Sequence, residues 1–173
     1  RAGRRIWGRP EADGHRCVAM EILAAALGPL HPGEALQVLE TYLALFRRYQ
    51  SPPENVILDV KANIASCLND MGRSDEALVL QREIYASAVA LRGVSHENTI
   101  RDGYNLIVSL FKLRRYEEVT TLLRDQLLPA ARRSLGPNHR MILNLKQSLA
   151  GALVGSPERS RDDLLEAETI MLD

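Results

Sequence analysis

A segment of about 42 residues recurs along this chain. The triplet Glu34-Ala35-Leu36 returns as Glu76-Ala77-Leu78 and then as Glu118-Val119-Thr120, at steps of 42 residues (76 − 34 and 118 − 76). Asn63 and Asn105 are also 42 residues apart. A fixed period of this length is typical of a stacked array, in which no single unit buries its own apolar face. The repeat therefore predicts an array of packed units, and such arrays bind other molecules more often than they transform them.

The second repeat contains the pattern of two helices. Apolar residues at steps of three and four predict a first helix over about 56–71, and Gly72 suits the left-handed backbone that ends such a helix. Ser74 is a favourable N-cap for a second helix, and the two acids after it suit the helix dipole. Gly93 then closes this second helix. The repeat is thus expected to be a pair of helices joined by a tight turn.

The third repeat copies this pattern with two departures. Its helices are expected over about 98–113 and 116–135, but Arg114 replaces the turn glycine and Pro129 falls inside the second helix. A proline inside an isolated helix removes a backbone hydrogen bond and costs about 3 kcal/mol. We therefore expect a kink near Gln126 rather than a break in the helix.

The outer repeats are less regular. Helices are expected over about 16–27 and 34–49 in the first repeat, and over about 140–154 and from about Arg161 in the fourth, where the turn is about five residues longer. No segment alternates apolar and polar residues for long enough to indicate a strand. The sequence therefore predicts an all-α fold of about four helix pairs. Its expected parts are a basic, poorly ordered stretch (1–14), a divergent first repeat (15–54), a second repeat (55–96), a third (97–139) and a fourth that is truncated in its second helix (140–173).

Charge and cysteine content exclude several classes of protein. Lysine and arginine total 22, as do aspartate and glutamate, and this net charge of zero disfavours a nucleic-acid or membrane-surface protein. Cys17 and Cys67 are too few for a disulfide framework, and Cys67 lies among apolar residues, so we expect a buried thiol there. The apolar runs are too short for a membrane helix and the start has no signal core, which favours a cytoplasmic protein. The start is nevertheless basic and is expected to be a solvated end: Arg1, Arg4, Arg5, Arg9 and Arg16.

No set of residues has the spacing of a catalytic, cofactor or metal site. His96 and His139 take equivalent places in successive repeats, which favours a structural role over metal binding. Neither a phosphate-binding glycine loop nor a nucleophile motif occurs. The acid pairs at 75–76, 117–118 and 162–163 each lie at the start of an expected second helix, where the helix dipole explains them. We therefore expect a protein without enzymatic activity, cofactor or metal.

Two parts of the repeat carry a family resemblance. The segment Ala-Asn-Ile-Ala-Ser-Cys-Leu at 62–68, followed by Met-Gly-Arg-Ser-Asp-Glu-Ala-Leu at 71–78, resembles the tetratricopeptide repeat (TPR) in its 42-residue kinesin light chain variety. The segment Leu-Gly-Pro-Asn-His at 135–139 is similar to the link between repeats in that variety. The resemblance covers about 56–153 well and about 21–49 less well. It implies a right-handed superhelical solenoid of antiparallel helix pairs, with the first helix of each pair lining the concave surface.

The resemblance also implies a peptide-binding groove. In the kinesin light chain variety an asparagine of the first helix faces the groove and contacts a bound peptide, and Asn63 and Asn105 match it here. An amide offers both a donor and an acceptor, so it can pair with the backbone of an extended peptide. The alternative is that the two asparagines only bridge adjacent helices. The expected groove residues are Asp59, Asn63 and Ser66 in the second repeat, Arg101, Tyr104 and Asn105 in the third, and Asn144, Gln147 and Ser148 in the fourth.

These observations predict a non-catalytic scaffold that binds an extended peptide or a segment of a partner protein in the groove. We expect no nucleic acid and no membrane among its partners. One alternative is a regulatory or substrate-recruiting TPR arm of a larger enzyme or signalling protein. Another is a self-association module that pairs through the exposed helical end near Asp173.

Overall fold

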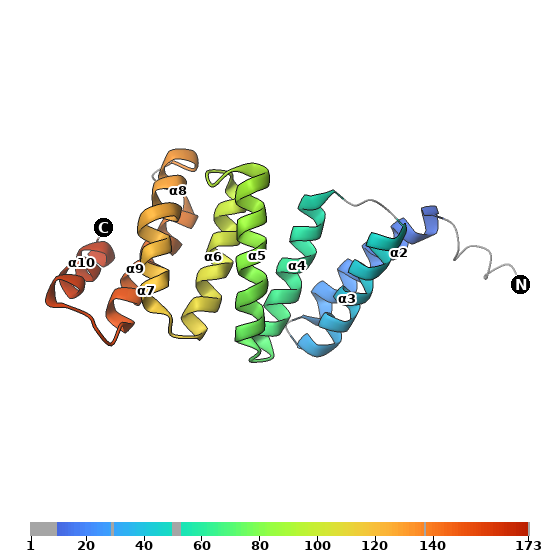
Figure 1. Ribbon diagram of the computed structural model, residues 1–173, viewed down its shortest axis with the longest axis horizontal. Coiled ribbons are helices and arrows are strands. Elements are labelled where there is room, and N and C mark those ends of the chain that lie inside the picture. The colour runs from blue at the N-terminus through green and yellow to red at the C-terminus, as the bar shows by residue number, and fades with distance from the viewer. Residues whose placement is uncertain (1–9, 29, 50–52, 137, 173) are drawn as a thin grey trace, which may run out of the picture. The chain divides into compact units, whose positions relative to one another are not determined.

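The computed structural model describes residues 10–28, 30–49, 53–136 and 138–172, and all regular structure in those ranges is helical. The chain forms two compact units, the first ending at Ala77 and the second beginning at Leu78. Helix α5 (Ser74–Arg92) crosses this boundary, so only its first turn belongs to the first unit (Figure 1). The expected all-α array of helix pairs is confirmed. Within the described ranges, no helix combines the length and the apolar character that crossing a membrane requires.

In its described residues, the first unit contains three complete helices, α2 (Pro10–Leu27), α3 (Pro32–Tyr49) and α4 (Glu54–Asp70). The start expected for α2 was wrong, because this helix begins six residues before Arg16 (16 − 10). A proline suits the first turn of a helix, where its missing N–H leaves no hydrogen bond unmade. Of the stretch expected to be poorly ordered, residues 10–14 are therefore helical, and residues 1–9 lie outside the described part of the chain.

Small and branched side chains form the core of the first unit. Ala35 of α3 is fully buried, and Leu39 and Leu58 are nearly so. Cys67 of α4 is also buried, as expected for a thiol on an apolar face, and it is a free cysteine. The side chain of Cys17 lies outside the described residues. Burying a leucine side chain contributes about 2 kcal/mol to stability, so Leu39 and Leu58 each stabilise the packing of these helices by about that amount.

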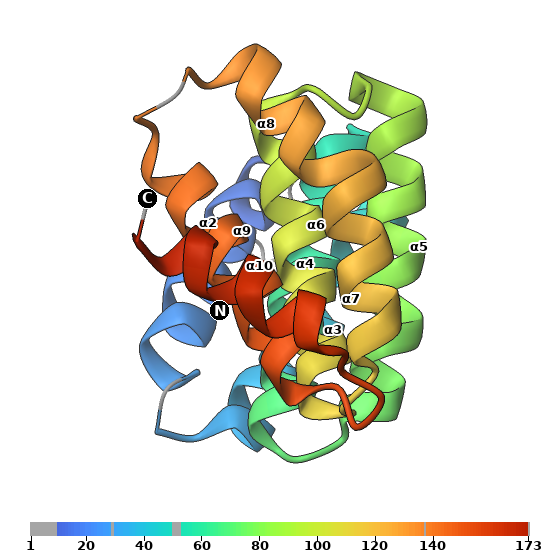
Figure 2. The ribbon, with the colours of Figure 1, turned by 90° about the vertical axis from the view of Figure 1, so that its left-hand side faces the viewer.

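The second unit continues from α5 through α6 (Glu97–Lys112), a composite helix, α9 (Arg140–Gly155) and α10 (Arg161–Leu172). The composite helix consists of α7 (Tyr116–Leu122), the π-helical segment η1 (Leu123–Leu127) and α8 (Leu128–Ser134). It packs against both α6 and α9, and α10 packs against α9 (Figure 2). The core between these helices contains fully buried aliphatic side chains, including Ile100, Ile107, Leu123, Leu127 and Leu145.

The proline inside the composite helix does not break it. Pro129 has no N–H, so the carbonyl of Asp125 loses its usual helical donor. Just upstream, the backbone N–H of Leu128 donates to the carbonyl of Leu123, five residues earlier, which is the hydrogen bond of a π-helix. The disturbance that we expected near Gln126 is thus a π-helical turn that includes this residue.

Gly72 and Arg114 occupy the same turn position, one repeat apart. Their φ angles are 78° and 56°, so both residues have left-handed backbone. In both turns the N–H of the next residue donates to a carbonyl in the preceding helix, at 2.8 Å after Gly72 and 3.0 Å after Arg114. Arg114 therefore adopts the left-handed conformation that glycine adopts in the equivalent turn, and this costs energy because its Cβ crowds the backbone.

The fourth helix pair has a long turn and a shifted register. Residues 156–160 separate α9 from α10. Ala167 is buried in α10, as Ala77 and Val119 are near the starts of α5 and α7. Ala77 and Val119 each lie three positions after the first residue of their helix, whereas Ala167 lies six positions after the first residue of α10. An additional turn at the start of α10 therefore precedes the position at which this helix meets its neighbours.

Candidate functional site

The first helices of the second, third and fourth pairs, α4, α6 and α9, each carry polar side chains that are accessible to solvent. On α4, the side chains of Asp59, Asn63 and Ser66 are accessible to solvent, and their spacing of four and three residues places them on one face. On α6 and α9 the predicted groove residues are exposed or half-buried. Arg101 and Gln147 belong to the exposed set, and Tyr104, Asn105, Asn144 and Ser148 to the half-buried set.

The two matched asparagines do not bridge helices. Neither the Asn63 amide nor the Asn105 amide forms a hydrogen bond with another residue in the described part of the chain. The backbone carbonyl of Asn105 accepts a hydrogen bond from the Ser109 hydroxyl at 3.5 Å, but the side chain takes no part in it. Each amide therefore keeps a donor and an acceptor for another molecule.

In the first unit, two of the predicted groove residues line a pocket of about 270 Å³. Asn63 and Ser66 belong to the α4 side of this pocket, where Cys67 and Asp70 complete the wall. Because α2 and α4 are the first helices of successive pairs, the pocket opens between two helices of the kind expected to line the groove. The other residues that line it are Ala24 and Ala25 of α2, Gly28 just after α2, and Leu39 of α3. We refer to it as the α2–α4 pocket.

The two ends of the α4 wall differ in charge and reactivity. Burial raises the pKa of the Cys67 thiol, and the nearby Asp70 carboxylate raises it further. The thiolate is the nucleophilic form of cysteine, so this thiol is poorly suited to covalent chemistry at neutral pH. Asp70, by contrast, is exposed and contributes a carboxylate to the edge of the pocket. The α2–α4 pocket therefore has an apolar side, an amide and a carboxylate.

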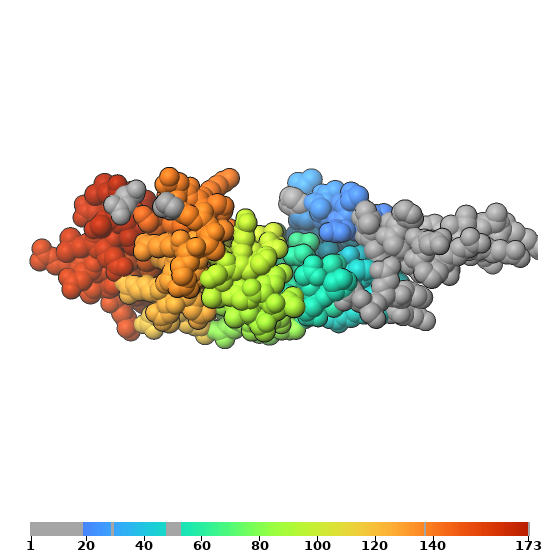
Figure 3. All heavy atoms as spheres, turned by 90° about the horizontal axis from the view of Figure 1, so that it is seen from above, coloured from blue at the N-terminus to red at the C-terminus, as the bar shows by residue number. Residues whose placement is uncertain are grey.

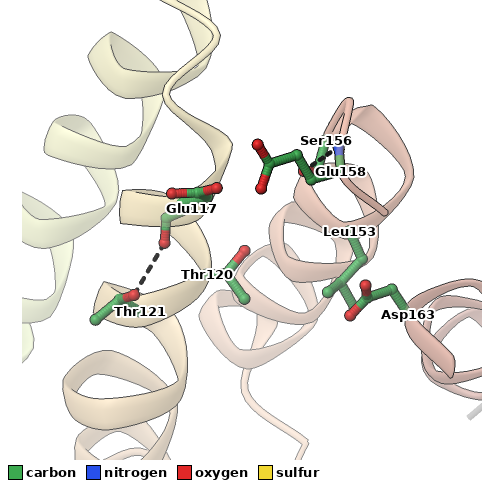
Figure 4. Close-up of a pocket in the computed structure, with 7 residues that line it drawn as sticks. All are labelled: Glu117, Thr120, Thr121, Leu153, Ser156, Glu158 and Asp163. Atoms are coloured by element: carbon green, nitrogen blue, oxygen red, sulfur yellow. Dashed lines mark hydrogen bonds between the residues drawn. The ribbon is translucent and has the colours of Figure 1, made fainter. Parts of the chain in front are cut away.

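A second pocket, of about 290 Å³, lies where α7, the end of α9 and the start of α10 meet (Figure 4). Glu117 and Thr120 of α7 face Glu158 of the long turn across it. Asp163 is engaged in the start of α10, because the Ser160 N–H and hydroxyl each donate to its carboxylate at 2.8 Å. These bonds lower the pKa of Asp163. No group of three or more potential metal ligands occurs among the described residues.

The two linking histidines have a structural role, as expected. The Nδ1 atom of His96 accepts a hydrogen bond from the backbone N–H of Asn98 at 3.2 Å, which caps the start of α6. The Nδ1 atom of His139 accepts from the N–H of Met141 at 3.2 Å and caps α9. Each imidazole thus satisfies a backbone donor that the helix itself leaves unpaired.

Sequence reasoning missed the α2 side of the pocket. Ala24, Ala25 and Gly28 belong to no motif. They line the pocket because their small size leaves space beside α4. Asp70 could have been found, because it lies seven residues after Asn63 and therefore on the same face of the helix.

The fold is that of TPR-like repeat proteins of the kinesin light chain kind. One crystal structure of a putative kinesin light chain with nearly identical TPR-like repeats, from Podosopora anserina, superposes with a TM-score of 0.73 and 19% sequence identity. That match covers 91% of this chain and 74% of the other. The crystal structure of BtubC (BKLC) from P. vanneervenii gives a TM-score of 0.74 at 14% identity, over 99% of this chain and 68% of the other. No family model and no curated protein sequence matches this chain.

Proposed function

We propose that this chain is a non-catalytic scaffold that holds an extended segment of a partner protein against the polar faces of α4, α6 and α9. The observation that carries this proposal is the state of the Asn63 and Asn105 amides. Both side chains are accessible to solvent and neither is used inside the described chain. An extended segment has unpaired N–H and C=O groups along its backbone, and one amide side chain can pair with both kinds.

The fold supports the same function. A repeat array presents the first helices of successive pairs as one series, so similar side chains recur at similar positions along a binding surface. In this chain an asparagine recurs on α4 and α6, and amide side chains continue on α9 with Asn144 and Gln147. A surface rich in amides recognises backbone more than side chains, which suits an extended ligand.

A capture experiment tests the proposal. The chain would be immobilised beside the double variant Asn63→Ala with Asn105→Ala, and bound proteins would be identified from cell extract by mass spectrometry. Asn138→Ala is the matched control, because Asn138 is an exposed asparagine in the link before α9. Circular dichroism would verify that all forms fold. We expect partners that bind the unaltered chain and the control but not the double variant. Partners that bind all three forms equally would contradict a role for the asparagines.

One observation favours a second candidate function, self-association through α10. Met171 is 64% exposed, whereas Leu123, its counterpart in the preceding pair by the alignment of Ala167 with Val119, is fully buried. Figure 3 shows α10 with solvent along its outward side. The helix is also acidic, with four carboxylates and one arginine, whereas residues 1–16 carry five arginines and two acids. These charges favour a second copy of the chain as the molecule that covers α10.

Light scattering during gel filtration tests this second candidate. We expect the mass to exceed that of one chain at high micromolar concentration and to fall on dilution. Met171→Glu should keep the mass at that of a single chain, because it places a charge in the apolar contact. A monomeric mass for the unaltered chain at every concentration would exclude self-association.

A further inference from the structure

We infer that an apolar face of α2 binds α10 of a second copy of this chain, so that the copies join head to tail. This face consists of Ile22, Leu23 and Ala26, and we refer to it as the α2 face. The inference rests on the second candidate function, self-association through α10, because it names the surface that α10 meets.

The α2 face is apolar and exposed. Ile22 is 65% exposed, Leu23 is 49% exposed, and Ala26 is exposed as well. Their spacing places the three side chains on one side of the helix. Glu21 is the only charged residue between positions 17 and 27. A helix with so little charge is typically buried on all sides, and an exposed apolar surface of this kind marks a site that another molecule covers.

The repeat buries the equivalent side of every other first helix. Steps of 42, 42 and 43 residues (64 − 22, 106 − 64 and 149 − 106) lead from Ile22 to Ile64, Leu106 and Leu149. These three side chains are at most 8% exposed. The same steps lead from Leu23 and Ala26 to residues that are also buried, which are Ala65, Ile107 and Ala150 for the first and Leu68, Leu110 and Leu153 for the second.

A first helix packs against the second helix of the preceding pair. Within the first unit α4 packs against α3, and within the second unit α9 packs against α7 and η1. Leu149 of α9 and Leu123 of η1 belong to one apolar core. The position of Leu149 in the repeat is that of Ile22, so the α2 face suits the second helix of another pair.

Helix α10 has the complementary surface. It is a second helix, and Met171 corresponds to Leu123, Gln81 and Leu39 at steps of 48, 42 and 42 residues (171 − 123, 123 − 81 and 81 − 39). Those three residues are at most 2% exposed, whereas Met171 is 64% exposed and its neighbour Leu172 is 82% exposed. The side of α10 that carries Met171 is therefore the side that the repeat buries in the earlier second helices.

A second copy of this chain is the occupant that fits both surfaces. When α10 of one copy meets the α2 face of another, each supplies the helix that the other surface is built to bury. The contact repeats the kind of junction that the chain forms between α3 and α4 and between η1 and α9. Because it joins two different surfaces, each pair of copies keeps one surface of each kind free, and association continues beyond two chains.

Two variants that block opposite surfaces test this arrangement. Ile22→Glu places a charge in the α2 face, and Met171→Glu places one on α10. Each variant alone should have the mass of a single chain in sedimentation equilibrium at high micromolar concentration. An equimolar mixture should have about twice that mass, because the mixture contains one intact surface of each kind and can form one contact. The unaltered chain should exceed this mass at the same concentration.

Controls make the test specific. Val79→Glu is the matched control, because Val79 is 71% exposed on α5, and this variant should associate as the unaltered chain does. Ala26→Glu changes the α2 face at a second exposed position, so it should be monomeric alone and should also pair with Met171→Glu. Circular dichroism would verify that every variant is folded.

The outcomes separate this inference from self-association through α10. If Ile22→Glu associated as the unaltered chain does, or if its mixture with Met171→Glu stayed at the mass of one chain, the head-to-tail contact would be wrong and self-association through α10 would stand. An unaltered chain that reached a plateau at two copies would indicate a symmetric contact and would also overturn the inference. A single-chain mass for the unaltered chain at every concentration would exclude both.

Discussion

Gly103 of α6 lies so close to Leu127 that a Cβ atom at position 103 would come within 2.5 Å of the Leu127 Cδ2 atom. Leu127 is fully buried in the π-helical segment η1, and the ring of Tyr85 lies at 3.0 Å from the same point. Because Gly103 of α6 has no side chain, Leu127 of η1 can pack directly against the backbone of α6. The contact joins the glycine of α6 to the π-helical segment η1.

Gly103→Ala should destabilise the second unit. The new methyl group would overlap a fully buried leucine, and overpacking of this kind costs about 1–3 kcal/mol. Alanine also gains about 1 kcal/mol over glycine inside a helix, so the net loss of stability should be up to about 2 kcal/mol. Urea unfolding followed by circular dichroism would measure it.

Gly151→Ala is the matched control for this contact. Gly151 is also inside a helix, but a Cβ there would lie 3.5 Å from Phe111, which is ordinary contact. We expect this variant to be stabilised by about 0.5–1 kcal/mol through helix propensity alone. Equal changes in the free energy of unfolding for the two variants would show that the contact with Leu127 does not destabilise Gly103→Ala.

Arg114→Gly should stabilise the chain. Arg114 has a φ of 56°, where the Cβ of any residue except glycine is crowded. Glycine relieves this strain but has more conformational freedom in the unfolded chain. The net gain in the free energy of unfolding should be about 0.5–1 kcal/mol. The measurement is again the free energy of unfolding in urea.

The reciprocal change provides the comparison for Arg114. Gly72→Ala should destabilise by about 1 kcal/mol, since the turn has the same backbone geometry and a Cβ at Gly72 would meet no other atom within 4 Å. If the two substitutions shifted stability in the same direction, backbone strain would not be what decides the stability of this turn.

His96→Ala should destabilise the start of α6 by about 1 kcal/mol, the usual value of an N-cap side chain. His139→Ala should cost a similar amount at α9, because the Nδ1 to nitrogen distance is 3.2 Å in both caps. Hydrogen exchange of the first-turn amides would detect the loss at each helix separately.

His96→Asn should restore most of the stability, because an asparagine oxygen at this position can accept the same backbone hydrogen bond. Equal stability of the alanine and asparagine forms would argue that the imidazole acts by packing and not as a cap.

Cys67 should make the chain less stable at alkaline pH. Burial raises the pKa of its thiol, and Asp70 adds to the shift, so the folded chain holds the thiol proton to a higher pH than the unfolded chain does. The stability that the protonated thiol contributes is fully present below about pH 8.5, where the thiol of an unfolded chain titrates. It is lost as the pH rises through the pKa of the thiol in the folded chain. Urea midpoints at about pH 7 and about pH 10 would measure the decline.

Cys67→Ala serves as the reference for this pH dependence. It should lose less stability than the unaltered chain over the same pH interval, because it has no thiol at position 67. An identical decline in the two forms would show that the thiol does not titrate differently on folding.

The repeat period and local chemistry were enough to predict most helices. The bounds of α4, α6 and α9 agree with the expected ones to within about two residues, because apolar spacing and turn glycines act over a few neighbouring positions. The start of α2 was missed because residues 10–15 carry no apolar stripe, and helical packing rather than pattern decides such an end.

The candidate site was predictable only in part. Helical spacing placed Asp59, Asn63 and Ser66 on one face of α4, and all three are accessible to solvent there. Spacing within one helix cannot reveal which small residues of a different helix leave a space beside that face. The α2–α4 pocket was therefore beyond the sequence, and the role of its residues in binding stays a prediction.

The sequence by itself determined the repeat, the helix pairs and the two histidine caps, because each depends on residues that are close together in the chain. Tertiary structure decided the tight approach of Leu127 to Gly103 and the largely buried 2.7 Å ion pair between Arg92 and Asp102. It also decided the pocket that brings Ala24 and Ala25 beside Asn63. Packing joins side chains that are far apart in the chain and settles which of them fill the space between helices, and no local pattern records that outcome.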